Sequence, residues 1–477
     1  MYRVFRATYR ALDRALFSRM PLQKQLALKA GVLRVARGMF PERIQAAHAS
    51  QLVDMSGSLS SDRPWQPPAL PAWVKDELRA LAAIDPELHP ENEAIARASF
   101  YSAPWCYDQP GQVYAQLWHS VERPVDVAIA VPWLKTGGAD LGAVHVANAL
   151  AEDLDRRVLV MATEDQDSPW ASRLSAKVQF LPIGRPLAPL APGHRLDVLV
   201  RLLLQLSPRV FHIMNSRLGW DAVVRNGLAL RQHMRIFASL YCDDFTPHGV
   251  PVGYARSYLP RCYTMLDGIL SDNTRTWRAW VQTMGVPASL FNVLPFPAPA
   301  TAAPTTRGAG KAILWAGRLD RQKRPDLLAR IAAAMPDFRF DVHGTSVCEQ
   351  GDLDMLRKLP NVVMHGAYAC FDDVVKDDHL ALLYTTAWDG MPNVLLEAAA
   401  AGLPVVAPDV GGITDFIPAA DLVASADDVP AYVKSIRDLS ENPALRAARV
   451  ESLRIKLAER RWEVFVRRLA GIEGYVA

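Results

Sequence analysis

The sequence predicts an α/β protein in which two doubly wound parallel-sheet domains follow a helical N-terminal extension. From residue 125 onward, short apolar runs alternate with helix-like segments. This alternation stops in a Pro-, Ala- and Thr-rich stretch at 292–310 and then restarts. Because ligands of such sheets bind at the carboxyl ends of the strands, we expect a cleft between the two domains. The expected boundaries are 1–120 for the extension and linker, 121–300 and 301–455 for the two domains, and 456–477 for a closing helix.

The overall composition is that of an ordinary globular protein. Of 477 residues, 50% are hydrophobic and 22% charged, and the net charge of +3 gives no argument for a nucleic-acid partner. The chain has no run of 18 apolar residues and no signal-peptide core. Its five cysteines lack the spacing of a zinc or disulfide framework. We therefore expect a cytoplasmic protein with reduced thiols.

Residues 1–47 form a basic segment that differs from the rest of the chain. Ten Lys and Arg residues stand against only Asp13 and Glu42, which gives a net charge of +8, and apolar residues recur at helical spacing. Such a helix either lies on an anionic membrane surface or packs as a solvated Arg-rich helix on the main body. The Ser- and Pro-rich residues 57–75 are interpreted as a linker.

The first sheet domain is predicted from four apolar runs. Strands are expected at 125–131, 157–163, 210–215 and 235–241, with a Gly-rich turn at 135–140 and a helix at 141–154.

The second domain repeats this pattern. Strands are expected at 311–317, 338–344, 361–366, 380–385 and 403–408, with helices at 324–335 and 393–402 and a charged helical tail.

Two basic residues follow the first strand of the second domain. Gly317 ends that strand, Arg318 comes next, and Lys323 precedes a helix. Glycine lets a ligand approach the backbone, while a guanidinium and an ammonium suit the oxygens of a diphosphate. The alternative is two solvated surface residues.

Two acids accompany the next helix of this domain. Asp389 lies in the loop after a strand, and Glu397 lies eight residues later inside the helix. A carboxylate at such a place can accept the hydroxyls of a ribose, and the helix start at Pro392–Asn393 offers backbone N–H groups to an anion. The apolar neighbours of Glu397 argue against the alternative of a solvated surface charge.

With these motifs, residues 125–470 resemble the retaining glycosyltransferases of family 4, which have the GT-B fold of two Rossmann-like domains. The resemblance rests on GRL with Lys323, on an acid-x7-Glu pair, and on AxAxGxPVVAxxxGG. It implies that Arg318 and Lys323 bind the donor diphosphate, that Glu397 binds the nucleotide ribose, and that Asp389 lies beside the donor sugar. The catalytic set would be Asp389, Arg318 and Lys323. Donor contacts would come from Gly317, Arg318, Lys323, Gly390, Met391, Pro392, Asn393, Glu397, Gly137 and Gly138.

The sequence departs from the family in three places. The first acid of the pair is Asp389 rather than Glu, and the GGxE-like loop ends in Asp140. Where many relatives carry a His, this chain has Tyr241, followed by Cys242 and Asp243. We assign Asp140, Tyr241 and Asp243 to the acceptor side or the general site. His212 and His248 lie near in sequence and are interpreted as structural.

The resemblance implies a transferase that moves a sugar from a nucleotide-diphosphate sugar to a glycan or lipid-linked glycan, as in bacterial surface-polysaccharide and lipopolysaccharide synthesis. Together with the basic segment 1–47, it implies an acceptor at the inner membrane and a peripheral contact of the protein there. It implies no cofactor and no metal. Three alternatives stay open. The first is a transferase with a metal-binding DxD motif, at Asp165 and Asp167 or at Asp352 and Asp354. The others are a sugar-nucleotide epimerase of the same fold and a non-catalytic sugar-nucleotide-binding scaffold.

Overall fold

The computed structural model describes residues 32, 72–88, 109–299, 310–346 and 350–476. The chain divides into two compact units, Met1–His119 and Ser120–Ala477. The predicted basic segment 1–47 lies outside the described residues, apart from the helical Val32. In the predicted linker, residues 72–75 belong to a helix, and the others lie outside the described residues. The elements described before residue 121 are α5 (Ala72–Ile84), a 3-10 turn (Pro86–Leu88) and α7 (Gln109–Ser120).

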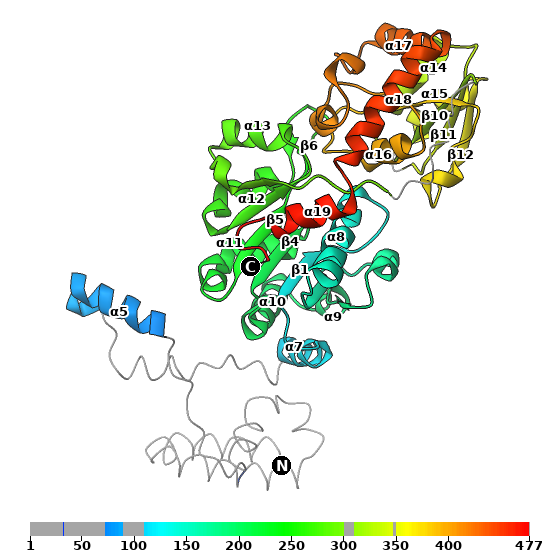
Figure 1. The fold of residues 1–477 in the computed structure, drawn as a ribbon. Coiled ribbons are helices and arrows are strands. Elements are labelled where there is room, and N and C mark those ends of the chain that lie inside the picture. Colours follow the sequence, from blue (N-terminus) through cyan, green and yellow to red (C-terminus); the bar gives the residue numbers. More distant parts are fainter. Residues whose placement is uncertain (1–31, 33–71, 89–108, 300–309, 347–349, 477) are drawn as a thin grey trace. The chain divides into compact units, whose positions relative to one another are not determined.

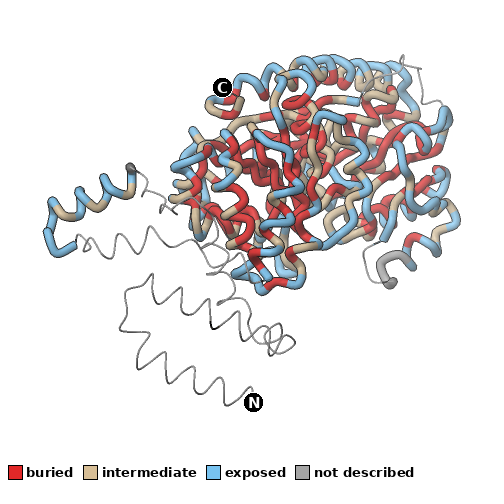
Figure 2. Tube along the Cα trace, turned by 90° about the horizontal axis from the view of Figure 1, so that it is seen from below, coloured by how far each residue is buried: buried red, intermediate tan, exposed pale blue. Residues whose placement is uncertain are grey.

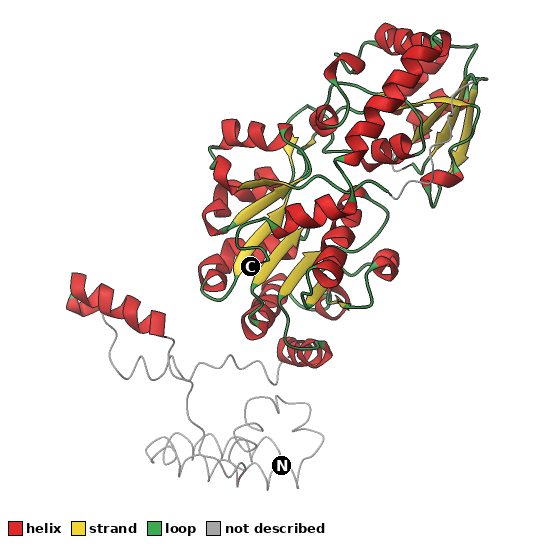
Figure 3. Ribbon diagram, in the orientation of Figure 1, coloured by secondary structure: helices red, strands yellow, loops and turns green. Residues whose placement is uncertain are grey.

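The second unit contains a seven-stranded parallel sheet followed by a five-stranded one. Figure 3 shows the strands of this unit in two separate groups. The first sheet has the order β3-β2-β1-β4-β5-β8-β9, and all its pairings are parallel. Its inner strand β1 reads VAIAV and is buried along its whole length, as expected for a strand covered on both faces. The strands are β1 (Val127–Val131), β2 (Val158–Ala162), β3 (Val178–Pro182), β4 (Val210–Met214), β5 (Arg235–Ser239), β8 (Gly268–Ser271) and β9 (Phe291–Val293).

The second sheet has the order β12-β11-β10-β13-β14, again with parallel pairings. Together the two sheets confirm the predicted GT-B architecture of two Rossmann-like domains. The last strand covers only two of the six residues expected at 403–408, because Pro404 and Pro408 have no N–H to donate to a ladder. The strands are β10 (Ala312–Ala316), β11 (Arg339–His343), β12 (Val362–Gly366), β13 (His379–Leu383) and β14 (Val405–Val406). A small antiparallel hairpin pairs β6 (Asp244–Phe245) with β7 (Pro251–Val252).

Helices connect the parallel strands and cover the sheets (Figures 1 and 3). The predicted helix at 141–154 begins three residues earlier, and its last turn is a π-helix over Ala149–Asp153. In the first sheet domain the helices are α8 (Gly138–Asn148), α9 (Gly184–Leu187), α10 (Pro192–Leu206), α11 (Arg217–Arg231), α12 (Tyr254–Cys262) and α13 (Arg275–Met284). After residue 310 they are α14 (Pro325–Ala333), α15 (Gln350–Arg357), α16 (Asn393–Ala400), α17 (Val429–Glu441), α18 (Pro443–Ala458) and α19 (Trp462–Ala470).

The apolar core lies on both faces of the second sheet. Ile313 and Trp315 of β10 join one buried cluster, while Leu314 and Ala316 join another. Successive residues of a strand point to opposite faces, so this alternation shows that helices cover both sides. Figure 2 shows the buried residues concentrated in the interior of this unit.

The chain ends in two helices, where a single closing helix was expected at 456–477. α18 packs on the second domain through Leu453 and Leu457, whereas α19 packs on the first through Phe465 and Leu469. The chain turns between them at Arg460, whose backbone oxygen accepts a hydrogen bond from the N–H of Ala298 at 2.7 Å.

Candidate functional site

Three side chains meet at the carboxyl ends of β10 and β13. The ammonium of Lys323 binds both Oδ2 of Asp389 and the hydroxyl of Tyr384, and that hydroxyl donates to the same carboxylate oxygen. Lys323 follows β10, whereas Tyr384 and Asp389 follow β13. These two strands are neighbours in the sheet, and their pairing brings the three groups together. The predicted residues Lys323 and Asp389 therefore form an ion pair, which we call the Lys323–Asp389 pair.

The pair is largely screened from solvent. The side chain of Lys323 is 13% exposed and that of Asp389 is 15% exposed. Burial, together with the charge of Asp389 and the hydrogen bond to it, raises the pKa of Tyr384 well above its ordinary value, so its hydroxyl stays a donor. The ammonium also lies 5.0 Å from the centre of the Tyr384 ring. In a site of low exposure these charge-assisted contacts are stronger than in water.

Arg318 is near this pair in sequence but binds elsewhere. Its guanidinium donates to Gln322 Oε1 at 3.0 Å and lies 3.2 Å from Asp320, and the side chain is 59% exposed. Gln322 in turn donates to the backbone oxygen of Trp388 at 2.8 Å, which joins the loop after β10 to the loop after β13. Gln322 was not predicted, because an amide between two basic residues has the pattern of an ordinary loop residue. Gly317 donates its N–H to the backbone oxygen of His343 at 3.0 Å.

The backbone after Asp389 is held from the first sheet domain. The N–H of Met391 donates to Oδ2 of Asp272 at 2.8 Å, and Asp272 lies directly after β8. The N–H of Gly390 donates to Oδ1 of Asp389 at 3.1 Å. Burial raises the pKa of Asp272 to about 7, although the N–H of Met391 and the amide of Asn273 act in the opposite direction. Asp272 was not predicted, because β8 has only four residues and a polar run follows it.

The predicted glycine turn of the first domain lies against the start of α16. A methyl group added at Gly138 would lie 3.4 Å from Nδ2 of Asn393. That amide nitrogen is buried and has no hydrogen-bond partner among the described residues. Gly137 is the N-cap of α8, and Pro392 is the N-cap of α16. The structure thus brings the two predicted donor-binding segments together.

Two of the residues predicted from the family departures lie beside this region. Asp140 is buried, and its Oδ2 accepts the N–H of Lys135 at 2.9 Å. Burial raises the pKa of Asp140 to about 6, against the effects of the Lys135 N–H and charge. The ring of Tyr241 packs 5.4 Å from that of Phe296, and its backbone oxygen accepts the amide of Asn273 at 2.8 Å.

Asp243 has a different environment from the other predicted residues. Its carboxylate accepts two hydrogen bonds from Arg256, at 3.0 and 2.7 Å, and one from Nε1 of Trp280 at 2.8 Å. This arrangement fastens α12 and α13 to the end of β5, which favours a structural role for Asp243.

Glu397 lies in α16, as predicted. Burial raises the pKa of its carboxyl, and the charge of Asp372 raises it further while that of Arg173 lowers it. Burial and the charge of Glu397 together raise the pKa of Tyr368. Tyr368 packs edge-on against His343, which is stacked on His365 at 4.4 Å between ring centres. This aromatic group at the ends of β11 and β12 carried no recognisable sequence pattern.

The remaining histidine and aspartate candidates have other environments. His212 is buried and binds the hydroxyls of Tyr475 at 2.6 Å and Ser239 at 2.9 Å, as suits a structural histidine. His248 is exposed. Asp165 and Asp167 form ion pairs with Arg185 at 3.4 and 3.6 Å.

The second DxD sequence can be described only in part. The side chain of Asp352 lies outside the described residues, and Asp354 pairs with Arg357 at 3.8 Å. Within the described ranges, no group of three or more His, Cys, Asp or Glu side chains is arranged to hold a metal ion. Nor does any helix in those ranges have the length and apolar character needed to cross a membrane.

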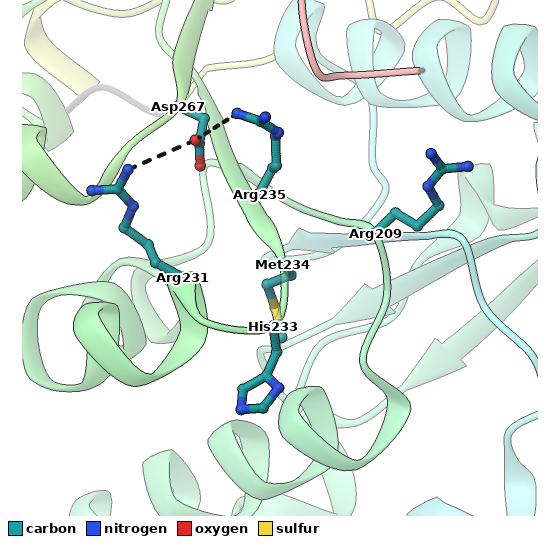
Figure 4. A pocket seen from close by; sticks show the side chains of 6 residues that line it. All are labelled: Arg209, Arg231, His233, Met234, Arg235 and Asp267. Carbon is teal, nitrogen blue, oxygen red and sulfur yellow. Dashed lines mark hydrogen bonds and ion pairs between the residues drawn. The ribbon is translucent and has the colours of Figure 1, made fainter. Parts of the chain in front are cut away.

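A cavity of about 400 Å³ opens at the amino ends of β4 and β5, as Figure 4 shows. Arg231 and Arg235 both pair with Asp267, at 3.9 and 3.2 Å. Parallel sheets bind ligands at the carboxyl ends of their strands. This cavity lies at the amino ends, on the opposite side of the sheet from where a ligand is expected. Its lining residues are Arg209, Arg231, His233, Met234, Arg235 and Asp267.

Residues 310–442 match the family of glycosyl transferases group 1. Over 139 residues, the chain is 27% identical to the O-antigen biosynthesis glycosyltransferase WbnH of Escherichia coli. This match covers 29% of the present chain and 40% of WbnH. Over 161 residues, it is 32% identical to D-inositol 3-phosphate glycosyltransferase 1 of Catenulispora acidiphila. This second match covers 30% of the present chain and 38% of that transferase. The chain thus spans about two fifths of the length of the curated relatives it matches.

Solved structures share the two-domain fold. The lipopolysaccharide outer core galactosyltransferase WaaB, in its apo form, superposes with a TM-score of 0.56 at 16% identity, over 72% of this chain and 97% of that one. Anabaena HepE in complex with UDP and glucose also superposes with a TM-score of 0.56 at 16% identity. The match covers 72% of this chain and 98% of HepE. At these identities the likeness establishes the fold and nothing finer.

Proposed function

We propose, from the match of residues 310–442 to the family of glycosyl transferases group 1, that the protein transfers a sugar from a nucleotide-diphosphate sugar to a glycan or lipid-linked glycan. The donor anomeric configuration would be retained, and the product would belong to a bacterial surface polysaccharide. The observation that carries the proposal is the Lys323–Asp389 pair at the carboxyl ends of β10 and β13. An ammonium and a carboxylate held there match the two charges that develop when a glycosyl phosphate bond breaks.

In the proposed reaction the two charges have separate tasks. Lys323, with Arg318 nearby in sequence, meets the negative charge that collects on the departing diphosphate. Asp389 favours the positive charge that develops on the anomeric carbon. Glu397 accepts the ribose hydroxyls, and the first domain presents the acceptor near Asp140 and Tyr241. No metal is required in this scheme.

The named relatives support a surface-glycan acceptor, since one of them is an O-antigen biosynthesis glycosyltransferase. The basic segment 1–47 would hold the protein at an anionic membrane where such an acceptor is found. HepE was solved with UDP and glucose, so a UDP-hexose is the first donor to try.

A thermal-shift screen with UDP-, GDP- and dTDP-sugars tests the proposal, because a ligand that binds only the folded state raises its melting temperature. The stabilising donor should then release nucleoside diphosphate slowly on its own and transfer its sugar once an acceptor is supplied. NMR of the first-formed product should show the donor configuration. Isomerisation of the sugar nucleotide would point instead to an epimerase, and no stabilisation by any donor would point to a scaffold.

A further inference from the structure

Asp272 joins the first sheet domain directly to the backbone that carries Asp389. It follows β8 and is only 2% exposed. One of its oxygens accepts the N–H of Met391 at 2.8 Å, and the other accepts the amide of Asn273 at 2.7 Å. Both of its oxygens thus have partners inside the protein, one of them across the domains.

Asp272 packs closely against the backbone of Gly390. A methyl group added at Gly390 would lie 2.8 and 3.0 Å from the two oxygens of Asp272, and 3.2 Å from the backbone oxygen of Tyr241. The carboxylate is therefore packed against the backbone next to Asp389. The N–H of Gly412 adds a 3.0 Å hydrogen bond to the backbone oxygen of Gly390.

The residues after Asp272 dock separately on the second domain. The N–H and hydroxyl of Thr274 donate to Asp415 at 2.6 and 2.7 Å, and Arg275 pairs with Asp409. These contacts join the same two domains but do not touch residues 389–391. The interface thus has two carboxylates, Asp272 and Asp415, that accept hydrogen bonds from the opposite domain. Of the two, Asp272 is the one bonded to the Asp389 loop.

We propose that Asp272 is a positioning residue, which fixes the backbone of Gly390 and Met391 and thereby holds Asp389 in place beside the donor sugar. The inference deepens the proposed function and rests on it for the sugar. The holding of the loop itself does not depend on that function. A carboxylate misplaced by about 1 Å can lower turnover by about 10²-fold while leaving the remote nucleotide contacts intact.

The test compares Asp272→Ala and Asp272→Asn with Asp415→Asn as the matched control. Amide hydrogen exchange of the peptide covering 386–392 is measured first, because it needs no activity. Exchange should speed up in Asp272→Ala, and to a smaller extent in Asp272→Asn, which retains one acceptor. It should be unchanged in Asp415→Asn. Equal exchange in all three variants and the parent would overturn the proposal, even if the parent is an active transferase.

Kinetics form the second arm. With the donor found by thermal shift, kcat should fall by about 10²-fold in Asp272→Ala, with Asp272→Asn intermediate, and the donor KM should change less than about twofold. An equal loss in Asp415→Asn would mean that both residues merely join the domains, which would also overturn the proposal. Faster exchange only in the Asp272 variants, in a protein without transferase activity, would support the holding of the loop and reject the proposed function.

Discussion

Lys323 and Asp389 lie 66 residues apart in the sequence and form an ion pair across neighbouring strands of the second sheet. In the absence of a ligand, each therefore neutralises the other. Under the proposed function, a diphosphate that takes the ammonium of Lys323 would have to share it with Asp389 or release that carboxylate toward the sugar. Donor binding and the placement of the acid would then be coupled through a single nitrogen atom.

Replacing Lys323 with Ala should weaken nucleoside diphosphate binding by about 10- to 100-fold. The change removes a charge-assisted contact, typically about 1.5–3 kcal/mol, and leaves Asp389 facing the phosphates. Calorimetry with the nucleoside diphosphate measures it. Lys434→Ala is the control, because Lys434 is an exposed lysine paired with Asp438 in α17. Unchanged affinity in Lys323→Ala would remove the residue from the donor site.

Replacing Asp389 with Asn should lower turnover by about 10²-fold or more, because a preorganised charge acts mainly in the transition state. Affinity for free nucleoside diphosphate should not fall, since the change frees Lys323 from its partner. Asp438→Asn controls for the loss of a paired aspartate. The double variant Lys323→Ala/Asp389→Asn should bind nucleoside diphosphate more tightly than Lys323→Ala alone. Parental turnover in Asp389→Asn would show that the acid has no catalytic role.

Replacing Glu397 with Gln should weaken binding of the whole nucleotide by about tenfold, because a neutral amide is a poorer acceptor for the ribose hydroxyls. The loss should be equal for the nucleoside diphosphate and for the sugar nucleotide, as the sugar is remote from the ribose. Calorimetry with both ligands compares them, with Glu441→Gln at the exposed end of α17 as the control. A loss confined to the sugar nucleotide would contradict the ribose assignment.

Chelation of divalent cations should leave transfer intact. The proposed site meets the diphosphate charge with Lys323, Arg318 and backbone N–H groups. Initial rates with and without EDTA, each followed by Mg²⁺ or Mn²⁺ addition, measure the effect. If EDTA abolished activity and a cation restored it, the DxD reading at Asp165 and Asp167 would return.

His212 should make stability depend on pH. Burial lowers its pKa to about 3 in the folded protein, against about 6.5 when unfolded. Between these values the unfolded chain binds the extra proton, so the contribution of His212 is complete above pH 6.5 and is lost as the pH falls. The stability gap between the parent and His212→Gln should be about 2 kcal/mol smaller at pH 5 than at pH 7.5. Urea unfolding at both values measures this gap.

His248→Gln, the same substitution at an exposed histidine, provides the control for His212→Gln. A gap between the parent and His212→Gln that stays constant from pH 7.5 to pH 5 would show that His212 does not remain neutral in the folded state.

The fold could be predicted because its signals are local. A buried parallel strand such as VAIAV at 127–131 is an apolar run that needs no partner to be recognised. The bounds of individual elements were predicted less well. Pro404 and Pro408 shorten β14. The tail is divided into two helices near Arg460, whose contact with the Phe416 ring forms only in the folded chain.

The site was predicted in its parts but not in its connections. Lys323 and Asp389 were recognised by their places after strands. Their direct bond depends on β10 lying beside β13, which sequence spacing alone does not specify. Asp272 lies 119 residues from its partner Met391 and follows a strand of four residues, so nothing local marks it. A contact between domains of this kind is visible only in three dimensions.

The core of the first domain is completed by residues made long after its strands. Tyr475 binds His212 and packs 4.8 Å from Phe237 between ring centres, and α19 adds Phe465 and Leu469 to the same cluster. His212 and Tyr475 are separated by 263 residues. At ribosomal rates of about 5–20 residues per second, that interval lasts on the order of 10–50 s. Throughout that interval the nascent first sheet lacks the side chains of α19 and Tyr475, which complete its apolar cluster.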